Sequence, residues 1–335
     1  MRARRRLIHA AFLFVLPIIV AVFGLSTVAA ILLVLLALLW RWALSVSALV
    51  VAQKGPDIIL DTICLSHFAE KTRWCLDRLG LDYVEQASAG VVGVVFTGRT
   101  VPRLRFRSGI AQSSIGNSPQ ILRYLWGAYG VALGERAAFL EPSAARLELE
   151  QRIDRYGVDL QVWVYYHILL DRSLSLRAWG ADSPLVPWWQ RMLLRPLFPL
   201  LAFFIRRTFS INAQHYAKAV QHIEDMLGDI DTRLADGRRS ILGGDDTNYV
   251  DIAFAAISGL WVQPNDYGGG KANACRIARN RMPPPMRADI ERWIEDYPNA
   301  TGFVARLYED ERIQGTKTPS GSPITKRAGA QEGGP

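Results

Sequence analysis

The sequence predicts an α/β domain followed by an all-helical domain, with an apolar segment in front of both. Residues 58–63 form a β-branched apolar run, and an amphipathic helical pattern follows directly at about 68–79. Beyond about residue 140, apolar residues recur at helical spacing as far as residue 312. Before residue 53, charged residues are almost absent apart from the first few positions. These three observations set the predicted order of the chain.

The N-terminal segment 1–53 is long and apolar enough to predict a membrane anchor. Residues 7–40 contain no Lys, Arg, Asp or Glu, whereas one membrane-spanning helix needs only about 20 apolar residues. We therefore expect transmembrane helices in a two-helix hairpin, at about 7–24 and 27–46. A cleaved signal peptide is the alternative, but its apolar core is only about 7 to 15 residues long.

The basic residues predict the orientation of this hairpin. Arginines precede the first predicted helix, and Arg41 and Lys54 lie near the end of the second. The positive-inside rule then places both groups on the cytoplasmic side of the inner, cytoplasmic membrane. The globular part would face the cytoplasm, whereas a single long span would place it outside.

Net charge and cysteine content restrict the class of partner. The formal net charge is +8, and five of the arginines responsible lie in the N-terminal segment. Without interleaved aromatic and basic residues, this charge predicts a lipid membrane as partner and no nucleic acid. The three cysteines, Cys64, Cys75 and Cys275, have no zinc-ligand spacing, so we expect no metal and a reducing compartment.

Three motifs in a fixed order give the chain a family resemblance. They are Ser66-His67-Phe68-Ala69-Glu70-Lys71, then Thr100-Val101-Pro102-Arg103-Leu104, then Asn117-Ser118-Pro119-Gln120-Ile121-Leu122-Arg123-Tyr124-Leu125. In this order the chain resembles the glutathione S-transferases over roughly residues 57–312. The resemblance implies a thioredoxin-like glutathione-binding domain at 55–128 and an all-α C-terminal domain at 140–312. The polar, Gly-containing residues 313–335 predict a disordered tail.

The resemblance also implies roles for individual residues. Ser66 stands at the catalytic position, where its hydroxyl would donate to the glutathione sulfur. Val101 would pair with the glutathione backbone, and the bond before Pro102 would be cis. Ser118, which we expect to cap the next helix, would bind the γ-glutamyl carboxylate. Asn117 departs from the family, which has an acidic residue or Gln there, and it brings no charge to the γ-glutamyl ammonium.

The function implied is conjugation of glutathione, as co-substrate, to a small hydrophobic electrophile. Two alternatives stay open: a glutathione-dependent isomerase, dehalogenase or lyase, and a non-catalytic interaction module at the membrane. The family commonly dimerises, which leaves a homodimer open here. The electrophile would lie between the two domains, where Trp163, Tyr165 or Tyr166 could line its pocket, although core packing is the simpler explanation for each of them.

Three further segments carry expectations. Residues 86–99 are Gly-rich and apolar, unlike the family, and predict a loop. Residues 184–207 combine aromatic side chains, arginines and three prolines, which fits either a helix at a membrane interface or a buried helix pair. Asn248 and Asp251 have the spacing of a capping box, which predicts a structural role for Asp251.

Overall fold

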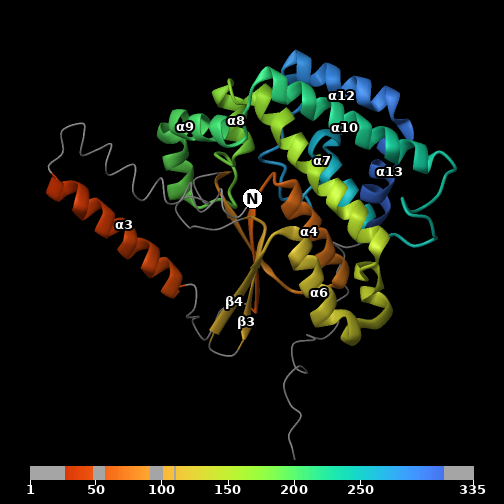
Figure 1. The fold of residues 1–335 in the computed structure, drawn as a ribbon, viewed down its shortest axis with the longest axis horizontal. Helices are drawn as coiled ribbons and strands as arrows, with labels where there is room; N and C mark the ends of the chain where they lie inside the picture. The colour runs from red at the N-terminus through yellow and green to blue at the C-terminus, as the bar shows by residue number, and fades with distance from the viewer. Residues whose placement is uncertain (1–26, 48–56, 91–100, 109–110, 313–335) are drawn as a thin grey trace, which may run out of the picture.

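The structure, a computed structural model, describes residues 27–47, 57–90, 101–108 and 111–312. Its centre is a four-stranded mixed sheet with the strand order β2-β1-β3-β4 (Figure 1). β1 runs parallel to β2 and antiparallel to β3, and β3 runs antiparallel to β4. The strands are β1 (Ile58–Ile63), β2 (Val84–Ser88), β3 (Arg103–Ser108) and β4 (Ala111–Gly116).

Two helices follow β1 and β4 and lie on one side of the sheet (Figure 1). α4 (His67–Leu79) begins after Ser66, whose side chain caps it, and ends at Gly80 in the left-handed conformation (φ 65°). Glycine adopts that conformation without the steric cost a side chain would bring. α6 (Ser118–Leu133) follows β4 and packs beside α4.

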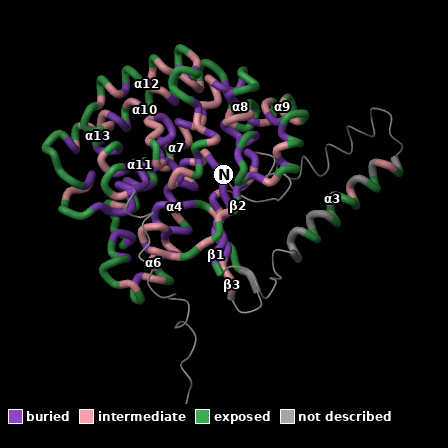
Figure 2. The backbone as a smooth tube through the Cα atoms, turned by 180° about the vertical axis from the view of Figure 1, so that it is seen from behind, coloured by how far each residue is buried: buried purple, intermediate pink, exposed green. Residues whose placement is uncertain are grey.

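The described residues after α6 are mostly helical and continue the same hydrophobic core. α11 (Tyr249–Val262) is buried along its whole length except at Val262, and it contacts both α4 and α7 (Ala144–Ile168). Residues far apart in sequence therefore share one interior, shown in purple in Figure 2. The remaining helices are η2 (Gly134–Leu140), α7 (Ala144–Ile168), α8 (Arg172–Ala178), α9 (Trp188–Thr208), α10 (Ala213–Leu234), α11 (Tyr249–Val262), η3 (Arg279–Arg281), α12 (Pro284–Asp296), α13 (Pro298–Leu307) and η4 (Tyr308–Arg312).

A mixed four-stranded sheet joined to a large set of helices fits the thioredoxin-like plus helical arrangement implied by the resemblance to glutathione S-transferases. The expected capping box is present: the Asn248 side chain accepts from the backbone at the start of α11, and Asp251 accepts from Asn248 N at 2.8 Å. Asp251 also accepts from Ser240 and from the Ile241 amide. Its role is therefore structural, as predicted.

Several expected element boundaries differ from the structure. The sequence pattern also predicts a strand at 100–104, but β3 starts at Arg103, and the pattern predicts no strand where β4 lies. Gly127, Gly130, Gly134 and Pro142 predict a linker at about 127–142, but this segment is mostly helical, because α6 continues to Leu133 and η2 (Gly134–Leu140) follows it. α6 has glycines where the sequence indicates a break, but Ile121, Leu122 and Leu125 bury its inner face and override that local signal.

The predicted anchor and tail lie partly or wholly outside the described residues. The first predicted membrane helix, 7–24, and the tail, 313–335, are not described. The loop expected at 86–99 is described only as far as residue 90, and there the prediction is wrong for residues 86–88, which belong to β2 because they pair with β1. The second predicted helix is α3 (Thr27–Ser47). Over the described ranges, no helix is both long enough and apolar enough to cross a membrane, so the predicted transmembrane hairpin finds no support there.

A buried ionic network ties α4 to β2 and to the last helical turn. Arg73 donates to Glu85 at 2.7 and 2.9 Å and to Glu70 at 3.3 Å. On the other side of Glu70, Arg312 donates to it at 2.9 Å and to Asp77 at 2.6 Å. The side chains of Glu70 and Arg312 are 0% exposed. Burial alone would raise the pKa of Glu85, but the charge of Arg73 outweighs it and lowers that pKa to about 2.

We expect Arg312→Gln to lower the free energy of unfolding by about 3–5 kcal/mol, because it leaves Glu70 and Asp77 without their buried cation. Chemical denaturation monitored by tryptophan fluorescence measures this loss. The matched control is Arg279→Gln, which removes an exposed charge and should change stability by less than about 0.5 kcal/mol. Equal stabilities for the two variants would contradict a structural role for the network.

Candidate functional site

Strand register brings the three sequence motifs to one end of the sheet. Asp61 near the end of β1 pairs with Arg103 at the start of β3, and Arg103 pairs with Gly116 at the end of β4. Ser66 follows β1 by three residues, Val101 and Pro102 directly precede β3, and Asn117 and Ser118 directly follow β4. The first turns of α4 and α6 therefore open at the same end. Each helix N-terminus carries a partial charge of about +0.5, which attracts anions.

Ser66 is a half-buried N-cap of α4. Its backbone is extended, and its Oγ accepts from the Ala69 amide at 3.3 Å. Ser66 therefore acts as an ordinary N-cap of α4. A hydroxyl that accepts one hydrogen bond still has its own O–H to donate, so capping leaves Ser66 able to donate to an anion at the helix end.

The other two motifs meet at the backbone. The Val101–Pro102 peptide is cis, as the resemblance implied, and Asn117 N donates to Pro102 O at 3.2 Å. Asn117, not Ser118, occupies the N-cap position of α6, so the expected cap is wrong by one residue. Asn117 is exposed, has φ 77° and makes no side-chain cap hydrogen bond. With φ 77° and ψ 125°, the Asn117 backbone lies outside the left-handed helical region in which Asn is common, so it is strained.

Ser118 is the first residue of α6 and is fully buried. Its Oγ has no hydrogen-bond partner within the described part of the chain. A buried hydroxyl without a partner costs about 1–3 kcal/mol. A ligand group that bonds to it would recover that energy, which makes Ser118 a polar group suited to a ligand at the α6 N-terminus.

His67 adjoins Ser66 but supplies no charge to the site. It is buried against Gly157 of α7, and burial lowers the pKa of its imidazole to about 4, with the Gly157 backbone opposing this in part. At neutral pH the ring is uncharged. Any anion at the end of α4 would therefore be stabilised by the helix N-terminus and by Ser66, not by an imidazolium.

Cys64 precedes the same turn but is buried at 2% exposure. Its Sγ lies 3.4 Å from Ser183 Oγ. Hydrogen bonding with Cys275, followed by that with Ser183, lowers the pKa of Cys64 despite its burial. The thiol is thus enclosed by partners from the C-terminal part of the chain, whereas Ser66 is the more accessible polar group of this turn.

Sequence reasoning missed the residues that hold this turn in place. Tyr267 donates from its hydroxyl to Leu65 O at 3.3 Å, and Arg73 Nη2 donates to Cys64 O at 3.4 Å. Tyr267 belongs to a loop for which the sequence offered no element. The one available signal was the run of charged residues in α4, since Glu70, Lys71 and Arg73 occupy a helix that otherwise packs as core.

Trp163 and Tyr166, two of the three aromatic residues considered for an electrophile pocket, take part in packing contacts between helices. Trp163 is fully buried and donates to Asp289 at 2.9 Å, and Tyr216, stacked on Tyr166 at 4.0 Å, donates to the same carboxylate at 2.8 Å. His167 Nε2 lies 3.4 Å from Asp289. These contacts join α7, α10 and α12, so they explain Trp163 and His167 as packing residues.

Over the described residues, no group of three or more His, Cys, Asp or Glu side chains could hold a metal ion.

Similarity to known proteins is found among solved structures and not among family models or curated sequences. The sequence matches no known family model and no curated protein. Among solved structures it is similar to a glutathione S-transferase from Methylobacterium radiotolerans in complex with glutathione sulfonate (19% identity, 81% of this chain, 98% of that chain, TM-score 0.46). It is also similar to a glutathione S-transferase from Methylobacillus flagellatus with glutathione bound (14% identity, 77% of this chain, 98% of that chain, TM-score 0.47). A third similar structure is a glutathione transferase family member from Pseudomonas fluorescens with bound S-(propanoic acid)-glutathione (15% identity, 79% of this chain, 100% of that chain, TM-score 0.42). These similarities are too remote to assign residues, so the site is assigned from this chain's own geometry.

The close approach of α4 to α7 depends on Gly157. A Cβ at this position would lie 2.9 Å from Phe68 Cζ and 3.1 Å from His67 Nε2. We expect Gly157→Ala to destabilise the protein by about 1–3 kcal/mol through overpacking, and to displace the turn that carries Ser66.

Thermal or chemical unfolding measures this effect, and Gly302→Ala is the matched control. Gly302 lies inside α13 with no atom within 4 Å of its added Cβ, so alanine there should stabilise by about 0.5–1 kcal/mol. A gain in stability at both positions would show that the α4–α7 contact is not tight.

Proposed function

We propose that the protein binds glutathione at the end of the sheet where α4 and α6 begin, and that it activates the glutathione thiol. The observation that carries the proposal is the convergence of two helix N-termini with the segment before β3 at one sheet end. Glutathione, a tripeptide with a carboxylate at each end and a thiol in the middle, matches this arrangement. Its γ-glutamyl carboxylate would meet the α6 N-terminus and its sulfur the α4 N-terminus.

Each predicted site residue has a stated role in this proposal. The γ-glutamyl carboxylate accepts from the first turn of α6 and from Ser118. The cysteinyl backbone pairs with Val101, beside the cis Pro102. The exposed Asn117 amide accepts from the γ-glutamyl ammonium, and because it is uncharged it contributes less than a carboxylate would.

Ser66 acts on the sulfur. Its O–H donates to the thiolate, and the positive end of α4 stabilises the same charge, so the thiol pKa falls and the proton leaves to solvent. The thiolate then attacks an electrophilic carbon of a small hydrophobic substrate. The new C–S bond forms as the leaving group departs with its electron pair, or as the electrons move into an acceptor double bond.

Several parts of the proposal rest on the sequence or on the family resemblance and not on contacts in the structure. No contact in the described residues separates transfer to an electrophile from isomerisation, dehalogenation or lyase chemistry with the same thiolate. Homodimerisation and attachment to the cytoplasmic membrane, with the globular part in the cytoplasm, are likewise proposals. A non-catalytic interaction module is the competing function, favoured by the uncharged Asn117.

Glutathione binding to the full-length protein, measured by titration calorimetry, tests the site. We expect Ser118→Ala to weaken binding roughly 10- to 100-fold, from the loss of a hydrogen bond to a charged group worth about 1.5–3 kcal/mol. Stability should not fall, because the Ser118 hydroxyl has no partner to lose in the described residues. A folded protein that shows no binding would leave the interaction module as the function.

Ser66→Ala separates capping from chemistry. Its loss of the α4 cap should cost about 0.5–2 kcal/mol of stability, as should the control Ser143→Ala, which removes the equivalent cap of α7. Only Ser66→Ala should also raise the pKa of the thiol of bound glutathione, which the thiolate absorbance measures. The same variant should lower turnover roughly 10- to 100-fold on a panel of electrophiles. An unchanged thiol pKa would assign Ser66 to capping alone.

A further inference from the structure

α9 (Trp188–Thr208) is a single helix with one buried face. The sequence of this segment fits either a helix at a membrane interface or a buried pair of helices. Gln190, Leu194, Leu201 and Ile205 form the buried face. The helix continues through Pro199, which has no N–H for the Arg195 carbonyl, because Arg172 donates to that carbonyl at 2.9 Å. Gln190 also accepts from the Ala89 amide at 2.8 Å and so fixes α9 to the sheet.

The opposite face of α9 is apolar and exposed. α9 lies at the periphery of the helical part, away from α12 and α13 (Figure 1). The side chains of Trp188, Met192, Leu200 and Phe203 are 50–65% exposed, and Trp189 and Leu193 are 38% and 37% exposed. Large apolar side chains gathered on one helix face need an apolar partner, because contiguous exposed patches of this kind are uncommon in monomers.

The charges of α9 indicate which partner that is. Its sequence contains Arg191, Arg195, Arg206 and Arg207 and no acidic residue. The arginines lie towards both ends of the apolar face. A helix with tryptophan and other large apolar residues on one face, flanked by arginines, fits the boundary between lipid headgroups and acyl chains. We propose that α9 is a membrane-contact helix that lies on an anionic lipid bilayer.

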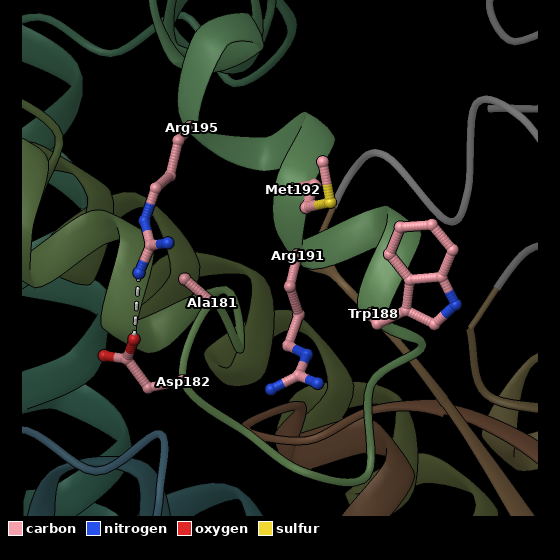
Figure 3. A pocket seen from close by; sticks show the side chains of 6 residues that line it. All are labelled: Ala181, Asp182, Trp188, Arg191, Met192 and Arg195. Atoms are coloured by element: carbon pink, nitrogen blue, oxygen red, sulfur yellow. Dashed lines mark hydrogen bonds and ion pairs between the residues drawn. The ribbon is translucent and has the colours of Figure 1, made fainter.

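A hollow of about 420 Å³ beside the first turns of α9 supplies a place for a lipid phosphate. Ala181, Asp182, Trp188, Arg191, Met192 and Arg195 line it (Figure 3). Arg195 lies 3.4 Å from Asp182, whereas Arg191 Nε is buried and has no hydrogen-bond partner among the described residues. The Arg191 guanidinium lies between this ion pair and the Trp188 ring. A phosphate in the hollow would accept from Arg191, while Trp188 and Met192 contact the apolar part of the lipid.

The test must report on α9 itself, because α3 also exposes large apolar side chains, including Leu32, Leu36 and Trp42. In the full-length protein, Phe203→Cys introduces an exposed thiol for an environment-sensitive fluorophore, and the three native cysteines are buried. The matched control is Val131→Cys, because Val131 is a fully exposed residue of α6.

With vesicles that contain phosphatidylglycerol, the label at residue 203 should brighten and shift to the blue, whereas the label at residue 131 should not. Vesicles of phosphatidylcholine alone should give a much smaller change, and added salt should reverse the shift. An unchanged label at residue 203 while the protein sediments with the vesicles overturns the proposal. A shift that appears with rising protein concentration and no vesicles also overturns it, because a second copy then covers this face.

Charge removal gives a second, independent readout. Arg206→Gln/Arg207→Gln should lower the partition coefficient that the residue 203 label reports by about 30-fold, because each arginine near an anionic surface contributes about fivefold. Arg191→Gln should lower it further by removing the phosphate contact in the hollow. The control Arg279→Gln/Arg281→Gln removes two exposed charges in η3 and should leave the partition coefficient unchanged. An equal loss in this control would assign binding to net charge, not to α9.

Discussion

The structure depends on charge buried around α4, which is unusual for a helix at the centre of a core. Two buried cations, Arg73 and Arg312, sit on either side of the Glu70 carboxylate. Burial opposes the charged form of each arginine, and the neighbouring carboxylates outweigh it and raise the pKa of both. Such a network is weak evidence of stability against an apolar core, but it permits only one arrangement of its members. It therefore specifies how the helix that presents Ser66 sits against β2 and the C-terminal turn.

The electrostatics of the candidate site follow from that placement. With α4 and α6 opening at one end of the sheet, two helix dipoles act on the same small volume. His67 is neutral and Asn117 is uncharged, so backbone amides and the Ser66 hydroxyl supply the attraction for an anion. This makes the site sensitive to backbone geometry. A shift of the turn by a fraction of an ångström would weaken the hydrogen bonds that these backbone amides can make.

The sequence predicted those parts of the fold that depend on local signals or on the family resemblance. Ser66 and Gly80 mark the two ends of α4, and Asn248 with Asp251 forms the capping box, because such motifs act over three or four residues. The cis bond before Pro102 followed from the resemblance. The start of α6 was misplaced by one residue because Asn117 and Ser118 both suit a cap, and only the backbone conformation separates them.

What the sequence could not predict depends on partners distant along the chain. No local pattern pairs Arg312 with Glu70, or brings Tyr267 to the Leu65 carbonyl, 202 residues away. β4 was missed because its polar sequence reads as a loop until pairing with β3 satisfies its backbone. The unpaired hydroxyl of Ser118 is likewise a property of packing, invisible in the residue type.

The separation of Glu70 and Arg312 by 242 residues has a consequence for synthesis on the ribosome. The sheet and α4 leave the exit tunnel long before Arg312 does. During that interval Glu70 has Arg73 as a partner but lacks the second cation that completes its surroundings. An α/β part in this state exposes the surfaces that α11 and η4 later cover. We therefore expect its folding to be completed only after Arg312 has emerged, together with the helical part.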